Sequence, residues 1–277
     1  MEDTLRFGTP AEAKAILETL PEHDRESASG RACAQIIRSI EHGDLLQSLV
    51  AGGVDLTRPS TSLVWRNPAG GDRVLIVFAG GARGYWLLVD ELHRVLRHCG
   101  AHVIYMRDFG PSYYLAGDPD LGIPDYRGML ALLRGQMAGL GATRLACIGN
   151  SAGGHAAVRY ALDLGAEAAL AFSMQANAES QHARHLAPVF QAIADRNPGF
   201  VFNLAEAYAA APRTPRLILC FGAGHERDRT EAERMAGLPG VRLEPAEGFA
   251  GHGAVRWFLQ QGRLPGLVAA LFGDASP

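Results

Sequence analysis

The segment 149–153, Gly-Asn-Ser-Ala-Gly, combines residue types and spacing that could carry chemistry. It follows the apolar run 145–148 and precedes an alanine-rich segment, so Ser151 stands between two glycines where a strand should give way to a helix. The pattern predicts a nucleophile elbow, a turn so sharp that only small neighbours avoid a clash. A serine hydroxyl displayed there can attack an acyl carbon. The alternative is a glycine-rich turn whose serine only caps the next helix.

A serine nucleophile needs a base and an acid that orients the base. His252 is the predicted base, because it lies in the glycine-rich segment 248–253 after the last predicted strand. Asp228 is the preferred acid, because it comes shortly before a helix predicted to begin at Thr230; Glu226 is the second candidate. The alternatives are a loop histidine that caps the following helix and a carboxylate in the first turn of a helix.

The developing oxyanion needs backbone donors. We expect one from the amide of Ala152, directly after the serine, and one from Gly81, with Gly80 next in preference, in the loop after the first long strand. Glycines after a first strand can also cradle a pyrophosphate. The glycine spacing in 80–84 does not fit that fingerprint, and only Asp108 would serve as the ribose-binding acid.

Short apolar runs alternate with helical patterns along most of the chain, which predicts an α/β fold with a doubly wound, mostly parallel sheet covered by helices on both faces. The first two strands are expected to pair as an antiparallel hairpin. The predicted strands are 63–66, 73–79, 101–107, 144–148, 168–173, 216–221 and 241–244. The predicted helices of this part are 85–98, 125–140, 152–164, 230–236, 254–261 and 265–271.

The domain organisation is predicted to be a helical N-terminal extension, 1–60, packed on a main domain, 61–277. Segment 174–213 lies where a lid could be inserted; it reads either as a small helical cap or as ordinary crossover helices. The polar-aromatic loop 108–124, with Tyr113, Tyr114 and Asp118, could line a cleft or could simply pack together.

Composition excludes several classes of function. The 277 residues have a formal net charge of −3 and no basic block, so no nucleic-acid partner is expected. No apolar stretch approaches the ~20 residues that span a bilayer. The N-terminus is acidic and has no secretory pattern, and the four cysteines show no metal-binding spacing, with Cys147 and Cys220 expected as buried thiols. We therefore expect a cytoplasmic protein.

From about 63 to 271 the sequence resembles the α/β-hydrolase superfamily of serine esterases, lipases and thioesterases. The segment 149–154 is similar to the elbow of hormone-sensitive-lipase-like esterases, which usually carry aspartate where Asn150 stands. The first loop departs from that family, because its usual His-Gly-Gly-Gly is here Phe-Ala-Gly-Gly at 78–81. The resemblance implies a fold and a reaction class rather than a substrate.

The function expected from these residues is hydrolysis of a carboxylic ester or thioester, small or carrier-bound, through an acyl-enzyme on Ser151. No metal or organic cofactor is expected. One alternative is an acyltransferase that passes the same acyl group to an alcohol or amine. The other is a hydrolase-like scaffold kept for binding, with the helical extension as its interaction surface.

Overall fold

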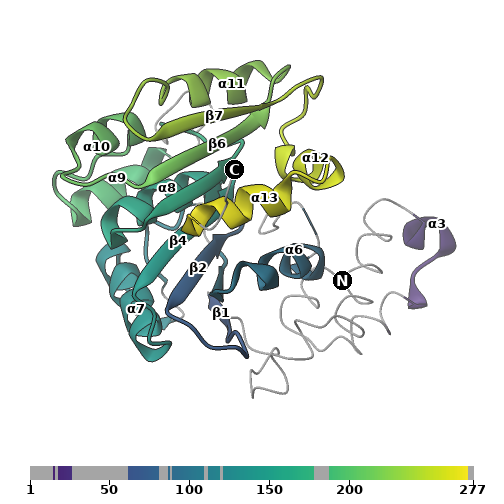
Figure 1. The fold of residues 1–277 in the computed structure, drawn as a ribbon, viewed down its shortest axis with the longest axis horizontal. Helices are drawn as coiled ribbons and strands as arrows, with labels where there is room; N and C mark the ends of the chain where they lie inside the picture. The colour runs from purple at the N-terminus through teal and green to yellow at the C-terminus, as the bar shows by residue number, and fades with distance from the viewer. Residues whose placement is uncertain are drawn as a thin grey trace.

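The computed structural model describes residues 18–26, 62–80, 89–108, 112–118, 121–177 and 187–273, together with residues 15 and 87. Its centre is a seven-stranded sheet in the order β1-β3-β2-β4-β5-β6-β7 (Figure 1). The strands are β1 (Ser62–Trp65), β2 (Arg73–Phe78), β3 (His102–Met106), β4 (Arg144–Asn150), β5 (Ala168–Phe172), β6 (Arg216–Gly222) and β7 (Val241–Ala246). Only the β1–β3 pair is antiparallel among these strands.

Helices cover both faces of this sheet (Figure 1). One face packs against α7 (Tyr126–Gly139), α8 (Ala152–Leu164), α9 (Ala187–Arg196), α10 (Leu204–Ala210) and α11 (Glu226–Glu233). The other face packs against α6 (Val89–Leu96), α12 (Ala254–Gln260), α13 (Leu264–Ala269) and the 3₁₀ turn η4 (Ala270–Phe272). A second 3₁₀ turn, η1 (Arg97–Cys99), follows α6, and α3 (Glu22–Arg25) lies near the N-terminus. The predicted doubly wound, mostly parallel α/β sheet is confirmed.

The central strands are mostly apolar because helices bury both of their faces. In β2, every residue from Val74 to Phe78 is buried, and β3 and β5 are buried along their whole lengths. The side chains of β4 alternate between the two core clusters, with Cys147 on the α8 side and Ile148 on the α12 side. The predicted burial of Cys147 and Cys220 is confirmed. The sheet is therefore a rigid platform, and its carboxyl edge can hold side chains in fixed positions.

The predicted hairpin of the first two strands is wrong. β1 pairs with β3, Ser62 opposite Met106, and β3 separates it from β2. The turn after β1 is tied to β3, since the Asn67 amide donates to Nδ1 of His102 at 2.9 Å. A partly exposed strand such as β1 is suited to a sheet edge, whereas β2, apolar and buried from Val74 to Phe78, needs a central position with two neighbours.

The helix predicted to begin at Thr230 in fact begins at Glu226, so Asp228 lies inside its first turn rather than before it. The cause is His225, whose side chain caps α11. The predicted extension 1–60 falls almost wholly outside the described residues, and the division of the chain at residue 60 stays a prediction. Within the described ranges, no helix has both the length and the apolar character needed to cross a membrane.

Candidate active site

Ser151 occupies the turn between the end of β4 and the start of α8. Its backbone has a conformation that residues other than glycine rarely adopt. Its φ is 54° and its ψ is −119°. The amide of Ser151 donates to the carbonyl of Phe172 at 2.8 Å, which extends the β4–β5 pairing up to the turn. A strained non-glycine residue persists only where its surroundings over-determine it, and such residues cluster at functional sites.

The two flanking glycines are required by close backbone packing. A Cβ on Gly149 would lie 2.0 Å from the carbonyl oxygen of Gly153, and a Cβ on Gly153 would lie 2.3 Å from the carbonyl oxygen of Ala79. Both separations are far below van der Waals contact. The glycine–serine–glycine spacing is therefore the consequence of a helix that starts directly against β4 and against the end of β2.

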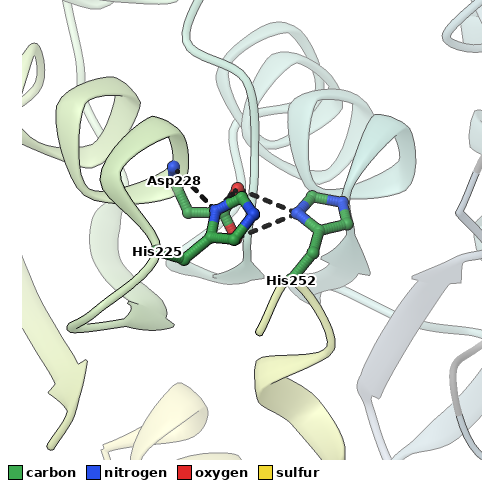
Figure 2. A group of neighbouring side chains, drawn as sticks. All are labelled: His225, Asp228 and His252. Atoms are coloured by element: carbon green, nitrogen blue, oxygen red, sulfur yellow. Dashed lines mark hydrogen bonds and ion pairs between the residues drawn. The ribbon is translucent and has the colours of Figure 1, made fainter. Parts of the chain in front are cut away.

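Asp228 and His252 face each other across the carboxyl edge of the sheet (Figure 2). Nδ1 of His252 lies 2.8 and 2.9 Å from the two carboxylate oxygens of Asp228. The carboxylate is an acceptor only, so the ring hydrogen belongs on Nδ1 and the lone pair on Nε2. Because Asp228 is buried (2% exposed), this hydrogen bond is protected from water.

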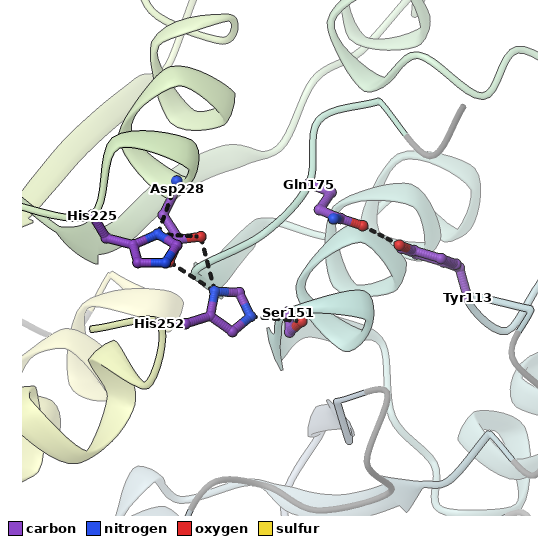
Figure 3. Close-up of polar contacts among 6 residues, drawn as sticks. All are labelled: Tyr113, Ser151, Gln175, His225, Asp228 and His252. Atoms are coloured by element: carbon purple, nitrogen blue, oxygen red, sulfur yellow. Dashed lines mark hydrogen bonds and ion pairs between the residues drawn. The ribbon is translucent and has the colours of Figure 1, made fainter. Parts of the chain in front are cut away.

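Nε2 of His252 in turn lies 3.0 Å from Oγ of Ser151 (Figure 3). With the lone pair on Nε2, the serine hydroxyl donates to the imidazole. The structure thus brings together the three residues selected in the sequence, from the ends of β4, β6 and β7. Glu226, the alternative acid, is exposed at the first position of α11.

The amide of Ala152 is the first of α8, where helical N–H groups have no intrahelical acceptor and point outward from the helix end. Gly80 is buried and follows the end of β2, which touches Gly153. Gly81 lies outside the described residues, so the choice between Gly81 and Gly80 stays a prediction.

Tyr114, expected from the sequence only as part of a loop that could line a cleft or pack together, holds the ends of two strands. Its buried hydroxyl lies 2.9 Å from the carbonyl oxygen of Ala79 and 3.1 Å from that of Met106. It donates a hydrogen bond that these two oxygens share. It thereby ties together the ends of β2 and β3 beside the predicted oxyanion loop. A tyrosine in a polar loop gives no sequence signal for this role, because the contact depends on the order of the strands.

The loop around Tyr113 and Tyr114 is packed rather than open. Tyr113, Tyr114 and Asp118 are all buried. The carboxylate of Asp108 accepts hydrogen bonds from the amides of Ser112 and Tyr114 at 3.0 and 3.1 Å. Asp108 therefore organises this loop. Its tyrosines were expected either to line a cleft or to pack together, and their burial shows that they pack.

Behind the serine, His155 of α8 is buried in a small polar network. Its Nδ1 lies 2.9 Å from the carbonyl oxygen of Gln175, and its ring meets Tyr113 edge-on. The Tyr113 hydroxyl donates to the side-chain oxygen of Gln175 (Figure 3). Burial lowers the pKa of His155 to about 4, so the ring stays neutral and donates through Nδ1.

This buried histidine predicts a specific loss of stability in acid. An unfolded histidine titrates near pH 6.5, so between pH 6.5 and 4 the unfolded chain gains a proton that the folded chain excludes. Lowering the pH from 7.5 to 4 should therefore cost the wild type about 3 kcal/mol more unfolding free energy than His155→Asn, whose amide can still donate. Urea unfolding at both pH values measures the difference. Equal losses in the two proteins would contradict the assignment.

His225 is the remaining side chain at this site. Its Nδ1 lies 3.2 Å from the amide nitrogen of Asp228 and 3.1 Å from Oδ1 of the same residue. Among the residues that the structure describes, His225, Asp228 and His252 form the one group of three whose donor atoms could hold a metal ion, all within 4.8 Å of one another. The spacing of His225 to Asp228 is that of an N-cap to N3, but histidine is not among the favoured N-cap residues, so the sequence carried no signal for it.

Comparison with known proteins supports the fold. No model of a protein family matches the sequence, and no curated protein does. Among solved structures, an S-formylglutathione hydrolase from Agrobacterium tumefaciens superposes with a TM-score of 0.55 at 15% identity, over 76% of this chain and 90% of that one. MPT51 of Mycobacterium tuberculosis superposes with a TM-score of 0.51 at 15% identity, over 76% of this chain and 92% of that one. An esterase domain from Rhodothermus marinus superposes with a TM-score of 0.51 at 14% identity, over 76% of this chain and 95% of that domain.

These identities are low, so the likenesses concern the fold alone. The chain has the α/β-hydrolase fold, as its resemblance to that superfamily implied.

Proposed function

We propose that this chain is a serine hydrolase that cleaves a carboxylic ester or thioester through an acyl-enzyme on Ser151. The observation that carries the proposal is the unbroken row of hydrogen bonds from Asp228 through His252 to Ser151. The row ends at a strained turn beside a helix N-terminus, where a hydroxyl is displayed and backbone amides point outward. The substrate is proposed to be a small or carrier-bound acyl compound.

In the first half of the reaction, Oγ of Ser151 attacks the acyl carbon while Nε2 of His252 takes the hydroxyl proton. The imidazolium that forms is stabilised by the buried carboxylate of Asp228. The negative charge on the former carbonyl oxygen is placed against the amide of Ala152 and, in this proposal, an amide of Gly81 or Gly80. The intermediate then expels the alcohol or thiol, which receives its proton from Nε2.

In the second half, water repeats the attack on the acyl-enzyme. Nε2 of His252 takes a proton from the water as the water oxygen bonds to the acyl carbon. The bond from that carbon to Oγ of Ser151 then breaks, Oγ receives the proton from Nε2, and the carboxylic acid is released. The carboxylate of Asp228 keeps the ring in the tautomer that both halves need. Each step uses side chains and amides of the chain together with water.

Asp228→Asn tests this division of roles. An asparagine that donates toward Nδ1 favours the tautomer with hydrogen on Nε2, so kcat for a p-nitrophenyl ester should fall about 10³- to 10⁴-fold. KM should change far less. Glu226→Gln is the matched control, because it removes a carboxylate two residues away that is exposed, and it should keep the wild-type rate. A slow Glu226→Gln variant together with an active Asp228→Asn variant would overturn the assignment of the acid.

A further inference from the structure

His225 is not needed by the acyl chemistry, yet its ring contacts the carboxylate that orients His252. Oδ1 of Asp228 lies 3.1 Å from Nδ1 of His225 and 2.8 Å from Nδ1 of His252. One carboxylate oxygen is thus approached by two ring nitrogens. Figure 2 shows both rings turned toward Asp228 from different elements, His225 at the start of α11 and His252 from the loop before α12.

The hydrogen-bonding demands on His225 conflict with each other. To accept from the amide of Asp228 at 3.2 Å, Nδ1 needs a lone pair; to donate to Oδ1 at 3.1 Å, it needs a hydrogen. With the lone pair in place, Nδ1 faces a carboxylate oxygen across an unfavourable contact. A cation between the ring and the carboxylate would replace this unfavourable contact, because Oδ1 and the lone pair of Nδ1 could both bind it; the Asp228 amide would then give up Nδ1 as its acceptor.

The donor set fits a late transition-metal ion. Tetrahedral zinc bonds nitrogen and oxygen at about 2.0–2.1 Å, which holds its ligands roughly 3.4 Å apart. The two nitrogen–oxygen separations are slightly shorter than this, and all three donor atoms lie within 4.8 Å of one another. Small rotations of the three side chains would therefore bring their donor atoms to the spacing that a tetrahedral zinc ion requires. Two imidazoles with one carboxylate favour zinc and its neighbours over magnesium or calcium, which prefer all-oxygen sites.

The two histidine rings are partly exposed to solvent, so an ion could reach the buried carboxylate between them. Asp228 is 2% exposed, whereas the side chains of His225 and His252 are 28% and 29% exposed. An ion would enter from the solvent side, between the two rings, and meet the carboxylate at the bottom. The fourth position would remain open to water.

We propose that His225, Asp228 and His252 form an inhibitory zinc-binding site. When the neutral ring of His252 binds the ion through the lone pair of Nδ1, its hydrogen moves by way of solvent from Nδ1 to Nε2, and the hydrogen bond from Nδ1 to Asp228 is lost. With its hydrogen on Nε2 and its lone pair on the ion, the ring cannot accept the proton of Ser151. The inhibition rests on the proposed serine hydrolase activity, whereas zinc binding does not.

The binding is tested by calorimetric titration of zinc into the full-length, untagged, metal-free chain. We expect one ion per chain in the wild type and in Ser151→Ala, and an affinity at least about tenfold weaker in His225→Asn. Asparagine is a favoured N-cap, so this variant keeps the cap of α11, which a thermal melt verifies. His98→Asn, which removes an exposed histidine, is the matched control and should bind as the wild type does. Equal zinc binding by His225→Asn, or none by the wild type, would overturn the site.

Labelling with a fluorophosphonate probe tests the inhibition. Zinc should slow labelling of the wild type, a chelator should restore it, and His225→Asn should resist the same zinc concentration. Wild-type labelling that zinc does not affect would refute the inhibition. If zinc binds as predicted but the metal-free chain never reacts with the probe, the metal site stands and the proposed hydrolase activity fails.

Discussion

Replacing Ser151 by alanine is expected to lower the rate of ester hydrolysis by roughly 10⁴- to 10⁶-fold, which is the scale seen when a serine nucleophile is removed. The loss should appear in kcat, because the acyl-enzyme can no longer form. Alanine keeps the Cβ of serine, so the backbone strain at φ 54° is unchanged and the fold should be retained. Steady-state hydrolysis of a p-nitrophenyl ester measures the effect.

Ser173→Ala is the matched control for this prediction. Ser173 is buried, has a positive φ (46°) as Ser151 does, and likewise follows a central strand, β5. In the part of the chain that the structure describes, its hydroxyl has no hydrogen-bond partner, whereas that of Ser151 contacts His252. Ser173→Ala should therefore keep the wild-type rate. A Ser151→Ala variant as active as Ser173→Ala would refute the nucleophile.

Gly149→Ala is expected to cost more than about 4 kcal/mol of unfolding free energy, which is exceptional for one methyl group. The added Cβ would lie 2.0 Å from the carbonyl oxygen of Gly153 and 2.9 Å from the amide nitrogen of Gly154. Both are backbone atoms, so relief requires moving the start of α8 away from β4. A melting temperature lower by about 10 °C, or failure to fold, is the predicted result.

Gly135→Ala separates this clash from the general effect of replacing glycine. Gly135 is an exposed residue of α7, and a Cβ there would meet no atom within 4 Å. Alanine is favoured over glycine inside a helix, so the melting temperature should rise by about 1–4 °C. A Gly149→Ala variant that melts like the wild type would show that the elbow tolerates a side chain, contrary to its packing.

The sequence allowed the sheet and the order of its chemical groups to be predicted because both depend on local patterns. Apolar runs such as that of β2 are long enough to require burial on two faces, and the glycines around Ser151 follow from a single tight turn. The order of serine, acid and histidine places each after a different strand, and in a parallel sheet these strand ends meet at one edge.

What the sequence did not allow to be predicted depends on contacts between distant segments. The pairing of β1 with β3 rather than β2 is decided by burial across the whole sheet. Tyr114 gains its role from the two strand ends that its hydroxyl joins. The early start of α11 follows from a histidine cap, which the usual capping preferences do not anticipate, and the same residue carries the proposed zinc site.

The most direct test of the proposed chemistry is covalent labelling of the full-length, metal-free chain with a fluorophosphonate probe, followed by mass spectrometry of the labelled peptide. The hydrogen bonds from Asp228 through His252 to Ser151 predict one adduct per chain, on the oxygen of Ser151, and none in Ser151→Ala. Absence of an adduct on the wild type, or an adduct at another residue that persists in Ser151→Ala, would contradict the proposal.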